Sequence, residues 1–231
     1  MAYAFLDTIV GSQSASNFFA PDTVQRHVVG TKIAGVDGYW GGGEFIYLKA
    51  NATLIMGGLS VWDVSYNATA APNTANTGRS VAAALFPMTS GQYGWFQIGG
   101  MAAVNATASV AAGVTFGITA AGQVGANSAG KQILNGASAA PSTTAVIKTN
   151  AMTVNGSAVV VVPNSDGWFV GITVSGTGIP GATTITSITP DGRTVTLSAN
   201  ATASGVVSLT GTYTGFIIAQ INNPFVQGAI T

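Results

Sequence analysis

The chain has 231 residues, no cysteine and one histidine, and its seven basic and seven acidic residues give a formal net charge of zero. Charged residues are only 6% of the chain, against about 25% in typical domains, while 47% are hydrophobic. This balance excludes the basic face that nucleic acids and anionic membranes require, and the absence of cysteine excludes disulfides and thiolate metal sites. The apolar content is too high for a disordered chain, and no segment offers about twenty consecutive apolar residues for a membrane helix.

Residues 1–30 show no sustained period of 2 or 3.6 and are predicted to form an N-terminal arm. Within the arm, "DTVQRHVV" permits a short helix with Asp22 as its N-cap. From residue 31 the pattern becomes typical of β-strands. The turn cluster "DGYWGGG" is followed by "EFIYLKA", where Ile46 and Leu48 are expected on one face and their aromatic neighbours on the other.

Residues 80–130 form a run of fifty-one residues without a single Asp, Glu, Lys or Arg. Inside it, "GWFQIGGMAAV" alternates as a strand, and we interpret its Gly-Gly pair as a β-bulge rather than a hairpin turn. Trp95, Gln97 and Met101 share one face of this strand, where Trp95 fits either a core or a subunit interface. Because the run is rich in glycine and free of charge, we expect neighbouring subunits to cover it.

The composition changes at the Ser/Ala/Pro/Thr-rich run "ASAAPSTTAV". The strands of residues 148–213 are more regular, beginning with "TVNGSAVVVV" as one strand and including a turn at "PDGR". The sequence therefore predicts an all-β protein with a small β-barrel or β-sandwich main domain, formed by residues 31–147 and 214–231. The arm precedes this domain, and residues 148–213 are inserted into it as a β-sandwich-like module.

No constellation of residues points to catalysis. His27 is the only histidine, so it cannot build a multi-histidine metal site, and the seven acidic residues are isolated from one another in the sequence. "GTGIPG" lacks the lysine and the helix of a phosphate-binding loop. We expect no enzymatic activity, with no catalytic residue, no metal and no cofactor.

Four stretches together resemble the capsid decoration (cement) proteins of tailed bacteriophages. They are "GTKIAGVDGYWGGGEFIYLKANA", "QYGWFQIGGMAAVNATASVAAG", "AAGQVGANSAGKQILNG" and "AQINNPFVQGAIT", and the resemblance covers residues 29–140 and 215–231. The stretch that interrupts them resembles β-modules of phage structural proteins. The resemblance implies a small β-rich protein, usually trimeric, that binds the outside of the capsid where major capsid protein subunits meet.

The expectation is therefore a structural protein on the outer surface of a virion, a homotrimer whose other partner is the major capsid protein, with no nucleic-acid or membrane partner. The candidate interface residues are Trp95, Gln97, Met101, Trp40 and Phe225. The alternative is a glycan- or receptor-binding component of a head fibre or tail adhesin, with the inserted module as its binding end.

Overall fold

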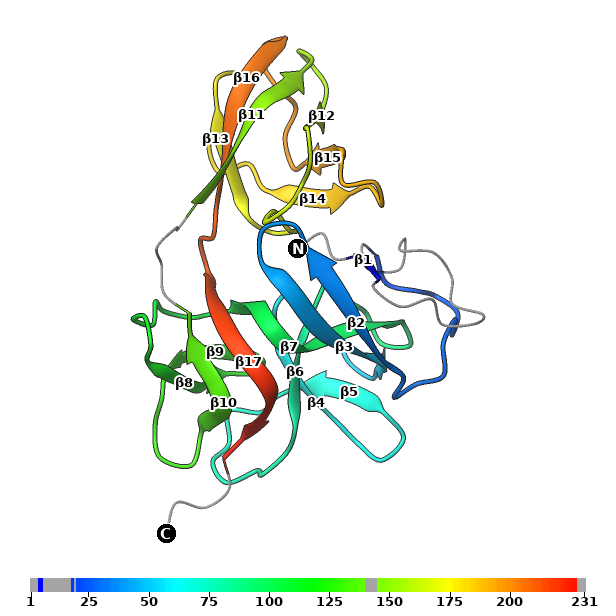
Figure 1. Ribbon diagram of the computed structural model, residues 1–231, viewed down its shortest axis with the longest axis vertical. Helices are drawn as coiled ribbons and strands as arrows, with labels where there is room; N and C mark the ends of the chain where they lie inside the picture. Colours follow the sequence, from blue (N-terminus) through cyan, green and yellow to red (C-terminus); the bar gives the residue numbers. More distant parts are fainter. Residues whose placement is uncertain (1–3, 6–17, 19, 140–144, 228–231) are drawn as a thin grey trace.

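The computed structural model describes residues 4–5, 18, 20–139 and 145–227. Their regular elements are seventeen β-strands in an eleven-stranded and a six-stranded sheet, which confirms the predicted all-β class. Within these residues no helix is long and apolar enough to cross a membrane. Figure 1 shows two lobes: the eleven-stranded sheet forms the main lobe, and strands β11 to β16 form the distal lobe above it.

The strands of the main lobe, in spatial order, are β1 (Ala4–Phe5), β2 (Lys32–Asp37), β3 (Gly41–Ala50), β5 (Asn67–Ala70), β4 (Leu59–Trp62), β6 (Val81–Ala84), β7 (Tyr93–Asn105), β17 (Phe216–Val226), β10 (Gln132–Ser138), β8 (Thr115–Ala120) and β9 (Gln123–Ala126). Those of the distal lobe are β13 (Thr173–Gly176), β16 (Gly205–Thr212), β11 (Ala145–Thr153), β12 (Val159–Val161), β15 (Thr194–Leu197) and β14 (Ile185–Ile188).

Five strands of the main lobe close into a small barrel. Strand β3 pairs with β7 on one side and in parallel with β5 on the other, so β3, β5, β4, β6 and β7 form a ring. The interior is filled by Ile46, Leu48, Ala50, Leu54, Ala68, Ala82, Ala84, Phe86, Met88, Phe96 and Ile98. Phe45 and Tyr47 of the same strand lie in a different cluster outside the barrel, which confirms the alternation predicted for "EFIYLKA".

The second half of β7 belongs to another curl of the sheet, together with β17, β10, β8 and β9. An isolated parallel bridge between Ala106 and Val124 brings β9 back to the end of β7. Strand β7 continues without a break through its Gly-Gly pair. On the neighbouring strand β3, Glu44 pairs with Gly99 and the next residue, Phe45, pairs with Gln97, so Ile98 of β7 has no partner on β3 and is an extra residue. The prediction of a bulge rather than a hairpin is confirmed, but the bulged residue is Ile98, directly before the predicted Gly-Gly pair. The bulge bends β7 from the barrel into the second curl of the sheet.

The distal lobe also curls on itself. The bridge between Thr173 and Thr184 connects the two ends of its sheet, and Trp168 lies fully buried in its interior. The predicted turn at "PDGR" is confirmed, since the backbone N–H of Gly192 donates to the carbonyl of Thr189 over 2.8 Å. The prediction of one strand over "TVNGSAVVVV" is wrong, because Gly156, at a φ of 81°, turns the chain between β11 and β12.

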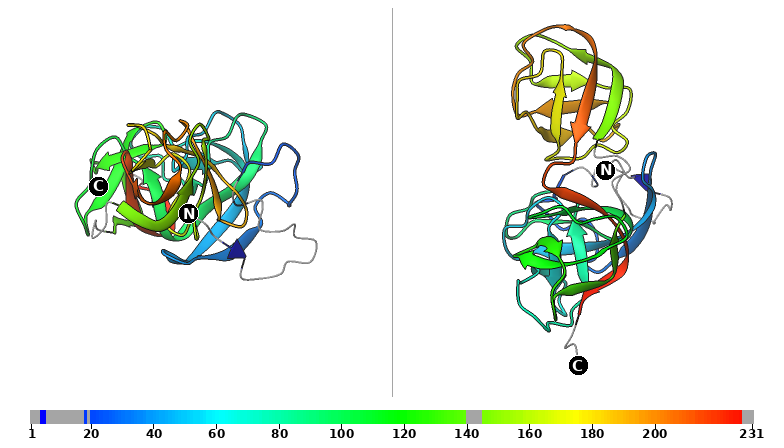
Figure 2. Two further views of the ribbon diagram at one scale, coloured as in Figure 1. Left: turned by 90° about the horizontal axis from the view of Figure 1, so that it is seen from above. Right: turned by 90° about the vertical axis from the view of Figure 1, so that its left-hand side faces the viewer.

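The chain enters the distal lobe after β10 and returns through β17, which inserts between β7 and β10 at the centre of the main sheet. Figure 2 shows the two lobes from the side, one above the other. Aromatic side chains of the two lobes meet between them. Phe169 meets Phe216 edge-on at 5.0 Å and stacks on Tyr213 at 5.5 Å, and Trp40 lies 5.8 Å from Tyr213. In addition to their two chain connections, the lobes share one continuous cluster of buried apolar residues, which includes Trp95 of the main lobe and Trp168 of the distal lobe.

Candidate functional site

The predicted interface residues do not form one surface. Trp95 and Gln97 have no exposed surface, so neither can contact a partner while the chain keeps this fold, and an interface role for these two is wrong. Trp95 packs against the rings of Phe18, Tyr47 and His27 at 5.0 to 5.8 Å. Of the two predicted roles for Trp95, core or subunit interface, the structure supports the core role.

Gln97 has a structural task at the bulge of β7. Its side-chain amide donates to the carbonyl oxygens of Gly99 at 2.9 Å and Met101 at 3.0 Å. These bonds satisfy backbone groups next to the bulge, where the strand ladder is interrupted. A buried glutamine in an apolar strand is thus explained without any partner.

The other three candidates are half-buried and lie on different elements. Met101 is on the second half of β7, Trp40 is at the junction between the lobes, and Phe225 is near the end of β17, where it pairs with Leu134 of β10. Each retains some exposed surface. Their interface role stays a prediction.

A buried polar cluster fixes the segment before β2. Asp22 bridges to Tyr93 of β7, and its carboxylate accepts a 2.7 Å hydrogen bond from the Tyr47 hydroxyl and a 2.8 Å ion pair from Arg26. The helix predicted at Asp22 is wrong, because this strand-like pairing uses the backbone that a helix would need. Burial lowers the pKa of His27 and, together with the bond to Asp22, raises that of Tyr47. All these groups are engaged in holding the segment against Trp95.

A second polar cluster lies at the junction of the lobes. The carboxylate of Asp37 accepts the backbone N–H groups of Tyr39 and Trp40, each at 2.8 Å, and so shapes the β2–β3 turn. On the distal side, the Lys148 ammonium donates to the Asn164 side chain at 2.8 Å. Burial lowers the pKa of Lys148.

Asp166 is the second carboxyl group at this junction. Its backbone carbonyl accepts a 2.6 Å bond from the Lys148 ammonium. Burial raises the pKa of its side chain, and the negative charge of Asp37 adds to the rise. Across the described residues, no three His, Cys, Asp or Glu side chains gather into a metal site. The hydrogen bonds named here run within one lobe or the other, and each set fixes the loop of its own lobe at the junction.

An open groove of about 370 Å³ crosses β2, β3, β7 and β17 on the main lobe. It is lined by Ala34, Gly35, Gly42, Gly43, Glu44, Gly99, Gly100, Gln220, Ile221 and Asn222. Gly100 is required by the fold, since its φ is 88° and a side chain there would overlap the carbonyl of Gly42. Gly42 is different: its φ is not left-handed, and a methyl group there would meet no atom of the described residues within 4 Å.

The four stretches that carry the family resemblance lie next to one another. They contain β2 and β3, β7, β9 and β10, and β17 respectively, and the ladders join β2 to β3, β3 to β7, β7 to β17 and β17 to β10. Segments more than a hundred residues apart therefore form one continuous sheet region. Three of the four contribute to the glycine-lined groove.

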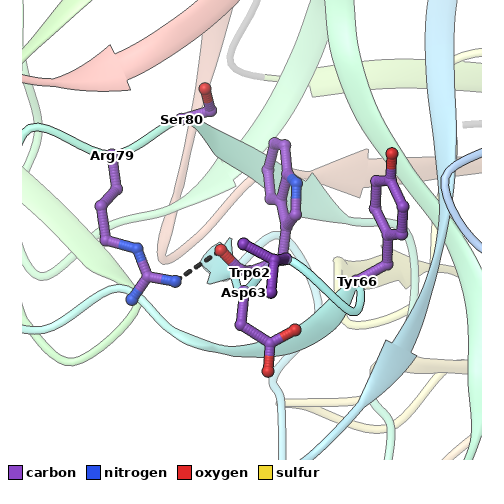
Figure 3. A pocket seen from close by; sticks show the side chains of 6 residues that line it. Trp62, Asp63, Tyr66, Arg79 and Ser80 are labelled. Atoms are coloured by element: carbon purple, nitrogen blue, oxygen red, sulfur yellow. Dashed lines mark hydrogen bonds between the residues drawn. The ribbon is translucent and has the colours of Figure 1, made fainter.

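A larger open cleft of about 680 Å³ lies at the loop that joins β4 to β5. Figure 3 shows the Trp62 indole standing between Arg79 and Ser80 on one side and Tyr66 on the other, with the Asp63 carboxylate at the rim. One guanidinium N–H of Arg79 donates to the Trp62 carbonyl. No motif predicted this cleft, although two aromatic residues and an acid in the short stretch "WDVSY" are a usable signal.

No family model, curated protein or solved structure matches the chain.

Proposed function

We propose that this protein decorates the outside of a bacteriophage capsid as a homotrimer and stabilises it by bridging major capsid protein subunits. The observation that carries the proposal is the continuous sheet region formed by the four decoration-like stretches, with its glycine-lined groove. The distal lobe then points away from the capsid.

Gly42 supplies the physical argument for a close neighbour. A glycine in a strand costs about 0.5–1 kcal/mol relative to alanine, because it loses more chain entropy on folding. None of the described residues requires glycine here, since a methyl group would meet no atom of theirs within 4 Å. An exposed backbone without a side chain permits close approach by another backbone, so we assign this position to contact with a neighbouring subunit of the trimer.

The test compares Gly42→Ala with Gly181→Ala, a matched control in the distal lobe where a methyl group also meets nothing within 4 Å. Both variants should be as stable as the wild type or more stable, by about 0.5–1 kcal/mol. Sedimentation equilibrium should show trimers for the wild type and for Gly181→Ala, and at least tenfold weaker association for Gly42→Ala. A monomeric wild type, or a Gly42→Ala protein that associates normally, would contradict the assignment.

Capsid decoration itself is tested by adding the purified protein to particles that lack it. Cryo-EM should then show extra density at many equivalent positions over the capsid surface, with the main lobe in contact with the shell. Density confined to a few positions would overturn decoration, whatever the oligomeric state.

A second candidate function, that of an adhesin, is favoured by one feature of the distal lobe. Its outer face presents exposed apolar side chains, with Met152 paired to Val161 on one side and to Val206 on the other. These three side chains are about half exposed. Such a row fits contact with a receptor, and low copy number per particle would favour this candidate.

A further inference from the structure

The Trp62 cleft is lined by a loop whose shape is fixed in several ways. The Asp63 carboxylate accepts backbone N–H groups from Ser65 at 2.8 Å and from Asn67 at 3.0 Å. These bonds, with the Asn67 side chain, lower the pKa of Asp63, so this carboxyl group is ionised at neutral pH. The cleft therefore carries one permanent negative charge at its rim.

Tyr66 is held in an unusual conformation on the other side of the cleft. Its φ of 60° is left-handed, which costs about 1–2 kcal/mol for a residue with a side chain. Its ring lies so close to Gly30 that a side chain at position 30 would overlap it. Strain of this kind persists only where the surrounding structure enforces it, and it is frequent at ligand sites.

The polar atoms around the two aromatic rings are available to a ligand. Within the described part of the chain, the Tyr66 hydroxyl and the Trp62 indole N–H make no hydrogen bond, and Arg79 uses one of its five N–H donors. Asp63 adds a carboxylate acceptor. The cleft thus combines two aromatic rings, the exposed apolar side chain of Val64, several hydrogen-bond donors, a carboxylate and two hydroxyl acceptors, and a net charge of zero.

From this arrangement we infer that the cleft binds a neutral saccharide. A pyranose ring has an apolar C–H face, which packs on an aromatic ring, and an edge of hydroxyl groups that both donate and accept hydrogen bonds. Trp62 and Tyr66 match the apolar face, while Arg79 and Asp63 match the hydroxyl edge. The volume of about 680 Å³ falls within the roughly 300–1,000 Å³ typical of small-molecule sites.

Other ligand classes fit this cleft less well. A purely apolar ligand would remove water from the remaining donors of Arg79 and from the Asp63 carboxylate without offering them new hydrogen-bond partners, which is unfavourable. An anionic ligand would gain from Arg79 but would be repelled by Asp63. A neutral ligand rich in hydroxyl groups satisfies both side chains at once.

Tryptophan labelling gives a direct test on the isolated protein. With 5-fluorotryptophan incorporated, the four tryptophans give four ¹⁹F signals, and Trp62→Phe identifies the signal of Trp62. Trp95 and Trp168 are fully buried, so a saccharide in the cleft should shift the Trp62 signal alone. Glucose, galactose, mannose, N-acetylglucosamine and their short β-linked oligomers are titrated to about 50 mM, since small sites of this kind bind near the millimolar range.

The expected result is a saturable shift of the Trp62 signal with at least one of these sugars. Arg79→Ala should weaken it at least tenfold, whereas Arg193→Ala, which removes an exposed arginine of the distal lobe, should leave it unchanged. Absence of any shift, or equal binding by Arg79→Ala, would overturn the inference. A shift of the Trp62 signal with protein concentration alone would also overturn it and make the cleft a subunit contact.

This inference does not depend on capsid decoration. The titration contains no capsid, and the capsid-binding experiment contains no sugar, so either proposal can fail while the other stands.

Discussion

Replacing residues 145–212 with about six Gly/Ser residues should leave a folded main lobe, because the two ends of the distal lobe's connections lie close together. After β10, the backbone N–H of Ala139 donates to the carbonyl of Ile218 over 2.8 Å, so the outgoing chain runs beside the returning one. Insertions at such points leave the host fold largely intact.

The cost of the replacement follows from the junction. Removing the distal lobe takes away Phe169 and its contacts with Tyr213 and Phe216. Two aromatic pairs at about 0.5–1.5 kcal/mol each give a loss of about 1–3 kcal/mol, and the newly exposed apolar surface of Tyr213 adds at most about 3 kcal/mol. This total lies at or below the lower end of the roughly 5–15 kcal/mol that stabilises a typical domain.

A truncation after Gly215 provides the contrast, because it removes β17 from the centre of the main sheet. Ile217, Ile218, Ile221 and Val226 are all buried there. At about 1.5–3 kcal/mol each, their loss amounts to about 6–12 kcal/mol, and two strand edges are left open.

Gel filtration and urea unfolding followed by far-UV circular dichroism distinguish the two variants. The linker variant should be soluble and unfold cooperatively, whereas the truncated protein should aggregate. A misfolded linker variant beside a normally folded truncation would refute the idea that the distal lobe is an insertion into an independent main lobe.

Two further predictions concern buried side chains. Burial lowers the pKa of His27 in the folded protein, so the unfolded chain takes up a proton more readily than the folded one. The free energy of unfolding should therefore decrease as the pH drops from about 6.5, the pKa of an unperturbed histidine, towards the lower pKa of the folded state. His27→Gln should reduce this fall in urea titrations at pH 7.5 and 5.5, and an unchanged pH dependence would contradict the assignment. Trp95→Ala should cost about 3–5 kcal/mol and loosen the main lobe, whereas Trp168→Ala should loosen the distal lobe only. Residue-resolved hydrogen exchange measures the loosening of each lobe. Loss of protection of β3 and β7 in Trp168→Ala would contradict the prediction that this variant affects the distal lobe only.

The sequence was sufficient to predict local features such as strands and turns, but not which distant segments pack against each strand. The alternation of Phe45 to Leu48 shows that both faces of β3 are apolar, and the structure gives each face its own cluster. Alternation does not reveal whether the covering atoms come from the same chain or from a partner. Trp95 was ambiguous for this reason, because its cover includes His27 and Phe18, in a segment without periodicity.

The parallel pairing of β3 with β5, which closes the first barrel, was likewise absent from the sequence analysis. In the sequence, β3 and β5 are separated by a loop and by β4, which pairs antiparallel with β5. No short-range sequence pattern predicts that β5 also pairs with β3. The candidate cleft depends on this pairing, because the β4–β5 loop that carries Asp63 and Tyr66 is positioned by it. The sequence shows the residue types of the cleft, but it does not show that Arg79 and Ser80 lie next to Trp62 and Tyr66 in space.

The uncharged run from residue 80 to 130 has an internal explanation. It contains β7, which lies between all three apolar clusters: Trp95 packs in one, Val104 in another and Phe96 in the third. A charged side chain on such a strand would be buried without a partner, at a cost of several kcal/mol. The lack of charge therefore follows to a large extent from the fold, and the expectation that neighbouring subunits must cover the run is not needed to explain it. The described residues do not explain Gly42, a strand position where alanine would fit and would stabilise the strand. A neighbouring subunit is therefore inferred from this glycine rather than from composition.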